Sequence, residues 1–209
     1  MTAALAIPKA YGLATVTAPI ENAVTLDEAK AHLRIDHDYE DAYIANLCRV
    51  GTLVAEAYQD RQFVTATYDL TIDGFPRQHN WRIDRGGAPI YLPKSPLSSV
   101  TSVKYLDENG TQQTLATTEY TVDAKTEPGR IVPAYQKTWP VNTRWHVATV
   151  TVRFVCGYGT AAQVPETTKT AIKTIISFLY ENREPADLMT TVPLHVRWLL
   201  DVDRVPRLY

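Results

Sequence analysis

The sequence is poor in cysteine and in long hydrophobic runs. Its two cysteines, Cys48 and Cys156, lie far apart and outside any Cys-x-x-Cys or Cys/His ligand spacing. We therefore predict two buried free thiols rather than a disulfide framework or a zinc site. No apolar run approaches the ~18 residues that are needed to cross a bilayer, so no membrane contact is predicted.

The sequence also lacks a large excess of positive or negative charge. The chain has 21 Lys and Arg against 23 Asp and Glu, for a net charge of -2 at pH 7. A protein that binds nucleic acid along its whole surface usually carries a clear basic excess. Such a protein is not indicated here, although a local basic face remains open.

Catalytic constellations are scarce. No G-x-S-x-G elbow occurs, no Cys/His pair stands out, and the five histidines are scattered: His32, His37, His79, His146 and His195. A hydrolytic enzyme would rest on isolated acids and histidines only. We therefore predict no enzyme and no catalytic, cofactor-binding or metal-binding residues.

The first part of the chain predicts a leader and two helices. Lys9 follows the mildly apolar N-terminal run instead of preceding it, which is the wrong order for a signal peptide, so residues 1–24 are expected to be an extended leader of a protein made in the cytoplasm. Thr25 and Glu28 form a capping-box pattern for a helix that ends near Ile35. Asp38 is expected to cap the next helix.

The second helix has an unusually wide apolar surface. Helical spacing predicts one apolar face and one polar stripe. The apolar face comprises Ile44, Leu47, Cys48, Gly51, Val54, Ala55 and Tyr58, and it is widened by Tyr43, Val50 and Ala57. The polar stripe comprises Asn46, Arg49, Glu56 and Asp60. A helix of this kind must be covered, either by its own chain or by a neighbouring subunit.

From Phe63 onward the hydrophobic period changes from about 3.6 to 2. Successive runs, separated by Gly, Pro and Asn, predict strands: FVTATYDLTIDGFP, WRIDR, PIYLP, SSVTSVKYLDENG, EYTVDA, GRIVP and VATVTVRFVCGYG. No helical period separates them. This spacing favours an antiparallel sandwich or barrel over a parallel, doubly wound sheet.

Helices return at Pro165, a favoured first helical position, and Pro185 ends that segment. A last helix is expected to start at Pro193. The fold class predicted is α+β, with a helical core of two helical pairs interrupted by an antiparallel β-rich insert. Its expected limits are 25–62 and 164–201 for the helical core, 63–163 for the insert and 202–209 for a C-terminal tail.

Two short motifs have a functional and a structural interpretation. Asp36, His37 and Asp38 are possible cation ligands, but three consecutive residues rarely point to one centre, so we interpret them as the corner between two helices. The letters GYGTAA match the dinucleotide fingerprint G-x-G-x-x-G/A. The next helix begins near Pro165, however, and no βαβ unit surrounds the glycines, so we interpret the segment as an elbow between insert and core.

The ordered series of elements resembles a known family. It starts with VTLDEAKAHLRIDHDYEDAYIANLCRVGTLVAEAYQDRQFVTATYDLTIDGFP and continues through IYLPKSPLSSVTSVKYLDENGT, EYTVD, GRIVPAYQKTWP, VTVRFVCGYG and VPETTKTAIKTIISFLYENRE. In this order the segments resemble tailed-phage head-to-tail connector proteins, also called adaptor or head-completion proteins, which gene transfer agents share. The resemblance runs from about Val24 to Leu200.

The resemblance implies a structural role in the neck of a virion. It implies a homo-oligomeric ring of twelve subunits that binds the portal protein during particle assembly, after DNA packaging. The ring would extend the DNA channel without binding DNA sequence-specifically. It would also give the next neck or tail protein a docking platform. The resemblance carries over no catalytic residues and no cofactor.

Our expectations for individual residues follow from their types. For the subunit interface we nominate Tyr43, Val50 and Val54. For portal docking we nominate aromatic, leucine and arginine residues at the C-terminus, which are Trp198, Leu199, Leu200, Arg204, Arg207 and Tyr209. Removal of the residues after Leu200 is expected to leave a folded subunit that no longer joins portal-bearing capsids.

One alternative function belongs to another class. The β insert contains Trp81, Trp139 and Trp145, and such rings can stack on sugars or line a peptide-binding groove. A carbohydrate- or peptide-binding module therefore remains open, although most such residues fill a β core.

Overall fold

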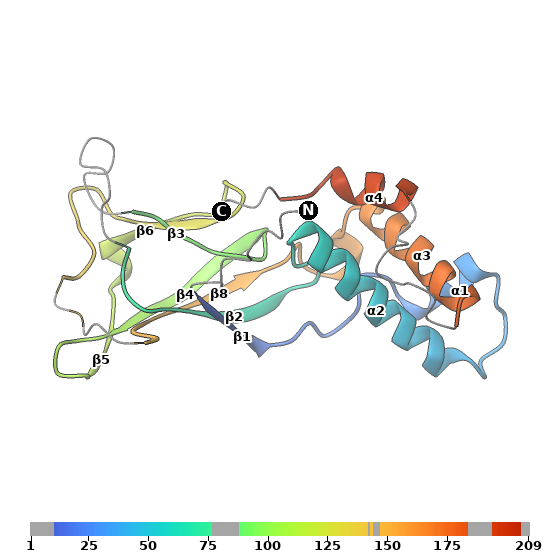
Figure 1. The fold of residues 1–209 in the computed structure, drawn as a ribbon, viewed down its shortest axis with the longest axis horizontal. Coiled ribbons are helices and arrows are strands. Elements are labelled where there is room, and N and C mark those ends of the chain that lie inside the picture. Colours follow the sequence, from blue (N-terminus) through green and yellow to red (C-terminus); the bar gives the residue numbers. More distant parts are fainter. Residues whose placement is uncertain (1–10, 77–87, 142, 144–146, 184–193, 206–209) are drawn as a thin grey trace, which may run out of the picture. The chain divides into compact units, whose positions relative to one another are not determined.

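The computed structural model describes residues 11–76, 88–141, 143, 147–183 and 194–205. These residues form two compact units. A β unit is built from the described parts of Met1–Thr17, Thr67–Leu92 and Leu97–Val155, and a helical unit from those of Ala18–Ala66, Pro93–Pro96 and Cys156–Tyr209. Apart from one N-terminal strand, the strands lie between two pairs of helices in the chain, so the α+β prediction is confirmed (Figure 1).

The β unit contains two sheets. The five-stranded sheet has the order β1 (Gly12–Thr17), β2 (Ala66–Ile72), β8 (Val150–Cys156), β4 (Leu97–Leu106) and β5 (Gln112–Thr114). The three-stranded sheet has the order β3 (Ile90–Tyr91), β7 (Arg130–Pro133) and β6 (Tyr120–Asp123), and a short 3-10 helix, η1 (Thr117–Glu119), precedes β6. β1 pairs with β2, β4 with β5, and β7 with both β3 and β6, all in antiparallel fashion.

Most of the predicted strands are present, and two strands were missed. WRIDR lies outside the described residues, whereas each of the other predicted runs contains a strand. The sequence did not predict β1 or β5. β1 lies within the stretch expected to be a leader, and its side chains are nearly all exposed, so alternating burial gave no signal.

Alternating side chains build the core of the β unit. Along β8 the buried residues are Val150, Val152, Phe154 and Cys156, at every second position. Phe75 stacks on Trp139 at a ring-centroid distance of 5.0 Å and meets the edge of Tyr105 at 5.7 Å. Gly129, just before β7, lies so close to Leu97 that an added Cβ would be 2.6 Å from the Leu97 Cβ. The two sheets therefore pack on each other through apolar side chains.

The helical unit contains α1 (Leu26–Leu33), α2 (Asp41–Gln59), α3 (Glu166–Glu181) and α4 (Leu194–Asp201), with a short 3-10 helix, η2 (Ala161–Gln163), before α3. The capping box of α1 is confirmed, because the Thr25 N–H donates to Glu28 Oε2 at 2.9 Å and the Glu28 N–H to Thr25 Oγ1 at 3.2 Å. Gly51 lets α2 approach α3 closely, since a Cβ there would lie 3.3 Å from Ile172 and Ile176.

One continuous apolar core holds the four helices together. Its fully or nearly fully buried members come from all of them and from the flanking segments: Ala23, Val24, Ala29, Ile44, Leu47, Cys48, Ala55, Phe63, Val164, Ala171, Ile172, Ile175, Ile176, Val196 and Leu200. The predicted leader thus contributes Ala23 and Val24 to this core. No described helix is long and apolar enough to cross a membrane.

Three details of the helix prediction were wrong. Glu40, not Asp38, occupies the N-cap of α2; it makes no capping hydrogen bond there, and the Asp38 carbonyl accepts from the Asp41 N–H. Pro165 is the N-cap of α3 rather than its first residue. Glu56, assigned to the polar stripe of α2, is only 5% exposed. The start expected for the last helix, Pro193, lies outside the described residues.

Candidate functional site

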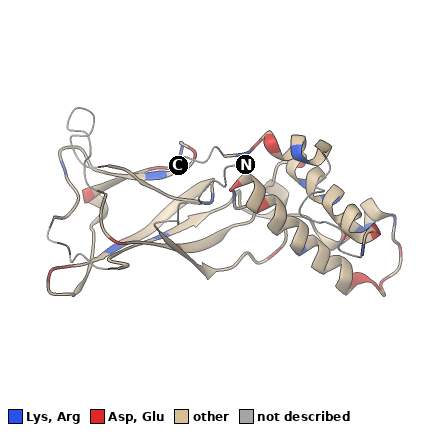
Figure 2. Ribbon diagram, in the orientation of Figure 1, with Lys and Arg blue, Asp and Glu red and all other residues tan. Residues whose placement is uncertain are grey.

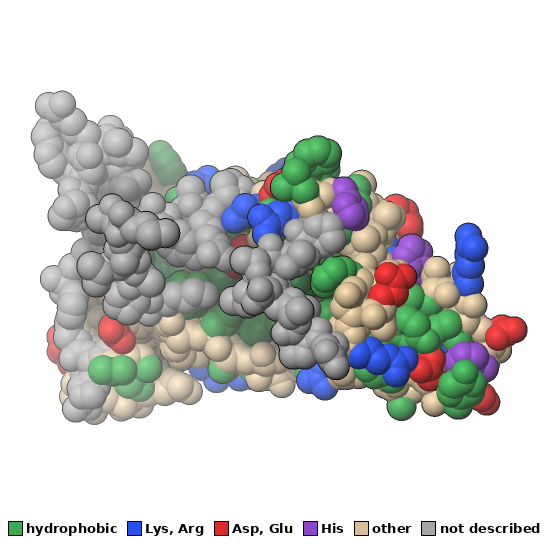
Figure 3. Space-filling view, turned by 45° about the vertical axis from the view of Figure 1, so that its right-hand side comes forward, with side chains coloured by type: hydrophobic (Ala, Val, Ile, Leu, Met, Phe, Trp, Pro, Cys, Tyr) green, Lys and Arg blue, Asp and Glu red, His purple; other side chains and the backbone are tan. Residues whose placement is uncertain are grey.

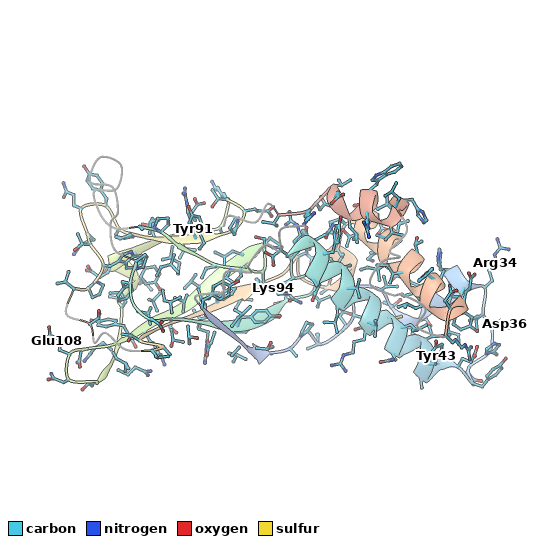
Figure 4. All side chains as sticks on the ribbon, viewed as in Figure 1. Arg34, Asp36, Tyr43, Tyr91, Lys94 and Glu108 are labelled. Carbon is cyan, nitrogen blue, oxygen red and sulfur yellow. The ribbon has the colours of Figure 1, made fainter. Side chains whose placement is uncertain are left out.

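The corner between α1 and α2 is mostly exposed: Asp36, Asp38 and Tyr39 are exposed, and His37 is half-buried. Figure 4 shows Arg34 and Asp36 in this loop and Tyr43 at the same end of the helical unit. The rings of His37 and Tyr39 stack with centroids 3.6 Å apart. Among the described residues no group of three His, Cys, Asp or Glu side chains is placed to hold a metal ion.

Glu40 fixes this corner, although it was not among the residues nominated from the sequence. Its carboxylate accepts hydrogen bonds from the Tyr180 hydroxyl at 2.5 Å and from Arg183 at 2.8 Å. These two donors hold the pKa of Glu40 below its usual value. The Arg183 guanidinium also lies over the rings of Tyr43, at 5.0 Å, and Tyr180, at 5.3 Å. Tyr43, nominated for the subunit interface, is thus partly covered by its own subunit.

A second surface runs along the outer side of α2. Val50 is half-buried, Val54 is 37% exposed, and Leu53, which the sequence interpretation passed over, is 53% exposed. With the exposed Ala57 they form an apolar stripe of four residues, which we call the α2 stripe. Leu53 could have been found from its spacing, because it follows Val50 by three positions and precedes Ala57 by four.

The C-terminal helix α4 presents a third surface. Leu194, Trp198 and Val202, spaced four residues apart, are 63%, 66% and 68% exposed, and we call them the α4 stripe. Trp198 was nominated from the sequence, whereas Leu194 and Val202 were not. Leu200 is fully buried and Leu199 packs against the core, so both contribute to the fold of the subunit. Arg207 and Tyr209 lie outside the described residues.

The segment after α4 is fastened to the end of α2. Gln59 donates from Nε2 to the Leu200 carbonyl at 2.7 Å, and its own carbonyl accepts from the Val205 N–H at 3.1 Å. Arg61 donates to the Asp203 carbonyl. Arg204, nominated for docking, lies over the Tyr58 ring at 4.9 Å. The chain is therefore held as far as Val205, which is 3% exposed.

A buried carboxylate lies at the same end of α2. Glu56 Oε1 accepts from Gln62 Nε2 at 2.7 Å and from the Phe63 N–H at 2.9 Å. Burial raises the pKa of Glu56 above its usual value. Since one carboxylate oxygen accepts from both donors, Glu56 organises the turn after α2.

The glycine motif and the cysteines are structural. Gly157 and Gly159 have φ values of +119° and +127°, and the Gly159 carbonyl accepts from the Thr65 N–H at 2.8 Å. α3 begins at Glu166, too far along the chain for these glycines to cradle a phosphate at its N-terminus. Cys48 and Cys156 are buried and free, as predicted. Burial raises the pKa of Cys48 to about 11 and that of Cys156 to about 12, so both remain thiols.

One of the three tryptophans considered for carbohydrate or peptide binding is buried. Trp139 is only 5% exposed, and its Nε1 donates to the Ala88 carbonyl at 2.9 Å, so its ring fills the β core. Trp81 and Trp145 lie outside the described residues.

Charged side chains of both signs are dispersed over both units (Figure 2). On the face shown in Figure 3, hydrophobic side chains form small separate groups among acidic, basic and histidine side chains. Neither view shows a continuous basic track.

Solved structures with a similar fold are known, although sequence comparison finds no match. The sequence matches no family model and no curated protein. The structure is similar to a chain from the neck of an empty gene transfer agent particle computed with C6 symmetry, with a TM-score of 0.75, 20% identity, and coverage of 95% of this chain and 97% of that one.

Two further chains are similar at the same level of identity. One comes from the virion of a native gene transfer agent particle, with a TM-score of 0.70, 20% identity, and coverage of 94% and 97%. The other comes from the neck of a native particle computed with C12 symmetry, with a TM-score of 0.68, 20% identity, and coverage of 95% and 97%. This chain has the fold of these particle components along nearly its whole length.

Proposed function

We propose that this chain is a structural connector in the neck of a tailed phage or phage-like particle, and not an enzyme. The observation that carries the proposal is the shared fold over 95% of this chain with a chain from a gene transfer agent neck. In this role the protein forms a ring, of twelve copies, beneath the portal. The ring extends the DNA channel and gives the next neck or tail protein a platform.

The α2 stripe supports the ring part of the proposal. Val50, Leu53, Val54 and Ala57 lie on one side of α2; Leu53, Val54 and Ala57 are exposed in the described subunit, and Val50 is half-buried. Burial of apolar side chains stabilises an interface by roughly 25 cal/mol per Å² of apolar area removed from water. We assign the α2 stripe, with the partly covered Tyr43 at its far end, to contacts between neighbouring copies.

The α4 stripe and the tail support docking to the portal. Trp198 is exposed on a helix whose other side is buried in the core. Arg204, six residues further along the chain, lies over the Tyr58 ring and forms an ion pair with Asp201. Trp and Arg are the residue types most enriched at interface hot spots. We assign Trp198 and Arg204, followed by Arg207 and Tyr209, to the portal contact, and Leu199 and Leu200 to positioning α4.

The mixed surface charge suits a conduit. DNA binding gains its strength from many Lys and Arg contacts to phosphates. With charges of both signs interspersed (Figure 2), DNA would pass through the channel without being held at specific sequences.

Electron microscopy of particles from the source tests the proposal directly, with this chain located by an added tag. A ring of tagged copies between portal and tail is the expected result. Absence of the tag from the particle would refute the connector function.

Paired variants separate the two assigned surfaces. Leu53→Asp is expected to prevent ring formation by the subunit, because it places a charge within the α2 stripe. Trp198→Ala is expected to leave the ring intact and to weaken its attachment to portal-bearing heads. Val141→Asp is the matched control, since Val141 is 82% exposed and belongs to neither stripe. Equal effects of all three substitutions would argue against both assignments.

A further inference from the structure

The five-stranded sheet has an uncharged open edge at β1. The sequence of β1 is GLATVT, and five of its six residues are exposed. It pairs with β2 from Gly12 to Thr17, with one irregularity around Val16. In the strand order β1 is outermost, so within the described chain its other side faces no strand. Backbone hydrogen bonds to β2, rather than buried side chains, hold this strand in the subunit.

The opposite side of the same sheet is open as well. β5 pairs with β4 at Lys104–Leu106, and the Leu115 N–H just after β5 donates to the Val103 carbonyl at 2.8 Å. The outer side of β4 from Leu97 to Ser102 therefore has no strand partner in the described part of the chain. Its sequence is LSSVTS, again without charge, and Ser98, Ser99 and Thr101 are exposed. The two open edges are each six residues long.

Uncharged open edges are unusual, because they invite pairing with another chain. Natural proteins usually block them with charged side chains, proline or very short strands. The second sheet of this unit follows that rule: β3 has two residues and is soon followed by Pro93, and β6 has four residues and ends at Asp123. In the first sheet, by contrast, the charged pair Asp69 and Arg153 lies on the inner strands β2 and β8.

We propose that the β1 edge of one copy pairs with the Leu97–Ser102 edge of β4 in the next copy, so that neighbouring five-stranded sheets join edge to edge. This inference rests on the proposed ring. Joining two different edges is a head-to-tail contact, and such contacts generate a ring when the rotation between neighbouring copies closes. Pairing of β1 with a second β1 would instead close a two-fold dimer and leave both β4 edges open.

Backbone pairing also explains why these edges need no special side chains. When a strand adds to a sheet, main-chain hydrogen bonds supply affinity, and the side chains only need to avoid repulsion. The two segments GLATVT and LSSVTS consist of small, neutral and β-branched residues with one leucine each. This composition suits a strand that is exposed in the monomer and paired in the ring.

Disulfide trapping in neck-bearing particles tests the inference. The chain would carry Ala14→Cys together with Ser98→Cys or Ser99→Cys, which sample the two faces of β4. Oxidation is expected to link successive copies into a ladder of oligomers in at least one of the two variants. Ala14→Cys with Thr121→Cys, on the blocked edge of β6, is the control and should give no ladder. The native cysteines are buried and do not interfere.

The possible outcomes of the disulfide-trapping experiment can be told apart. Cross-linked dimers from Ala14→Cys alone would show β1 pairing with itself and overturn the inference. No ladder from either variant, in particles where the unmodified chain forms a neck ring, would overturn it while leaving the connector function intact. If the unmodified chain is absent from the neck, the connector function fails and this inference fails with it.

A charge placed on the open edge provides an independent test. Val16→Lys is expected to abolish ring assembly, because it adds the kind of side chain that blocks edges, and to leave the melting temperature of the subunit unchanged. Val141→Lys, at an exposed position that belongs to neither β1 nor β4, should assemble normally. Ring assembly by Val16→Lys equal to that of the control would contradict the inference.

Discussion

The hydroxyl of Tyr180, near the end of α3, donates a 2.5 Å hydrogen bond to the carboxylate of Glu40, the N-cap residue of α2, across 140 positions in sequence. Arg183 adds a second hydrogen bond and covers the rings of Tyr43 and Tyr180. This cluster joins the first helical pair to the second at one end of the helical unit. The Asp36-His37-Asp38 corner is held in place by it.

Replacement of Glu40 by Gln is expected to lower the melting temperature at neutral pH, because the amide makes weaker hydrogen bonds to Tyr180 and Arg183. The folded protein lowers the pKa of Glu40 below 4.5, so the charged form stabilises the fold above that pH. This contribution is lost as the pH falls through the folded-state pKa. The difference in melting temperature between the wild type and Glu40→Gln should therefore shrink in acid.

Thermal unfolding of both proteins between neutral pH and pH 3 measures this difference. Glu108→Gln, in an exposed turn, is the control and should follow the wild type at every pH. A Glu40→Gln deficit that stays constant down to pH 3 would show that the carboxylate charge has no role.

Ionisation of Glu56 is expected to have the opposite effect on folding stability. Burial raises its pKa above 4.5 in the folded state, so ionisation costs stability as the pH rises through that folded-state pKa. Glu56→Gln keeps an oxygen for Gln62 and Phe63 and removes the buried charge. It should be as stable as the wild type or more so at pH 7, with the advantage vanishing below pH 4.5.

The comparison variant is Glu56→Ala, which leaves two buried donors without their acceptor. It should lose roughly 2–4 kcal/mol of unfolding free energy. Urea unfolding at pH 7 and pH 4 distinguishes these results. A destabilised Glu56→Gln at pH 7 would indicate that the charge itself stabilises the turn.

Gly157→Ala is expected to destabilise the helical unit by roughly 1–3 kcal/mol or more, because φ at this position lies in a region that L residues rarely adopt. An added Cβ would also lie 2.9 Å from the backbone of Thr65. Gly74→Ala is the matched control, since nothing lies within 4 Å of its Cβ position. Denaturant midpoints of the two variants measure the effect, and equal midpoints would contradict the prediction.

The structure revises the expectation for C-terminal truncation. Removal of the residues after Leu200 also removes Asp201, Asp203 and Val205, which bond to Tyr58, Arg61 and Gln59. We expect that truncation to lower the melting temperature. Truncation after Val205 keeps these contacts and should leave the melting temperature unchanged while weakening attachment to portal-bearing heads, measured by co-sedimentation. Normal attachment after that shorter truncation would remove Arg207 and Tyr209 from the docking surface.

Local patterns predicted the helices and most strands well. The capping box at Thr25 and Glu28 involves only four adjacent residues, and the alternation of apolar and polar residues in β8 involves only seven. Both patterns can therefore be recognised from the sequence alone. β1 escaped prediction because an exposed edge strand has no buried face and therefore no alternation. Trp139 and Trp198 could not be told apart by residue type, although one is buried and the other is 66% exposed.

The sequence by itself determined the α+β class, the two helical pairs and the free, widely separated cysteines, because periodicity and spacing act over a few residues. Only the tertiary structure decided that Glu40 meets Tyr180, that Leu200 is buried while Trp198 is not, and that two uncharged edges flank one sheet. Each of these depends on contacts between segments far apart in the chain. Such contacts are fixed by how the whole core packs, and no short stretch of sequence records them.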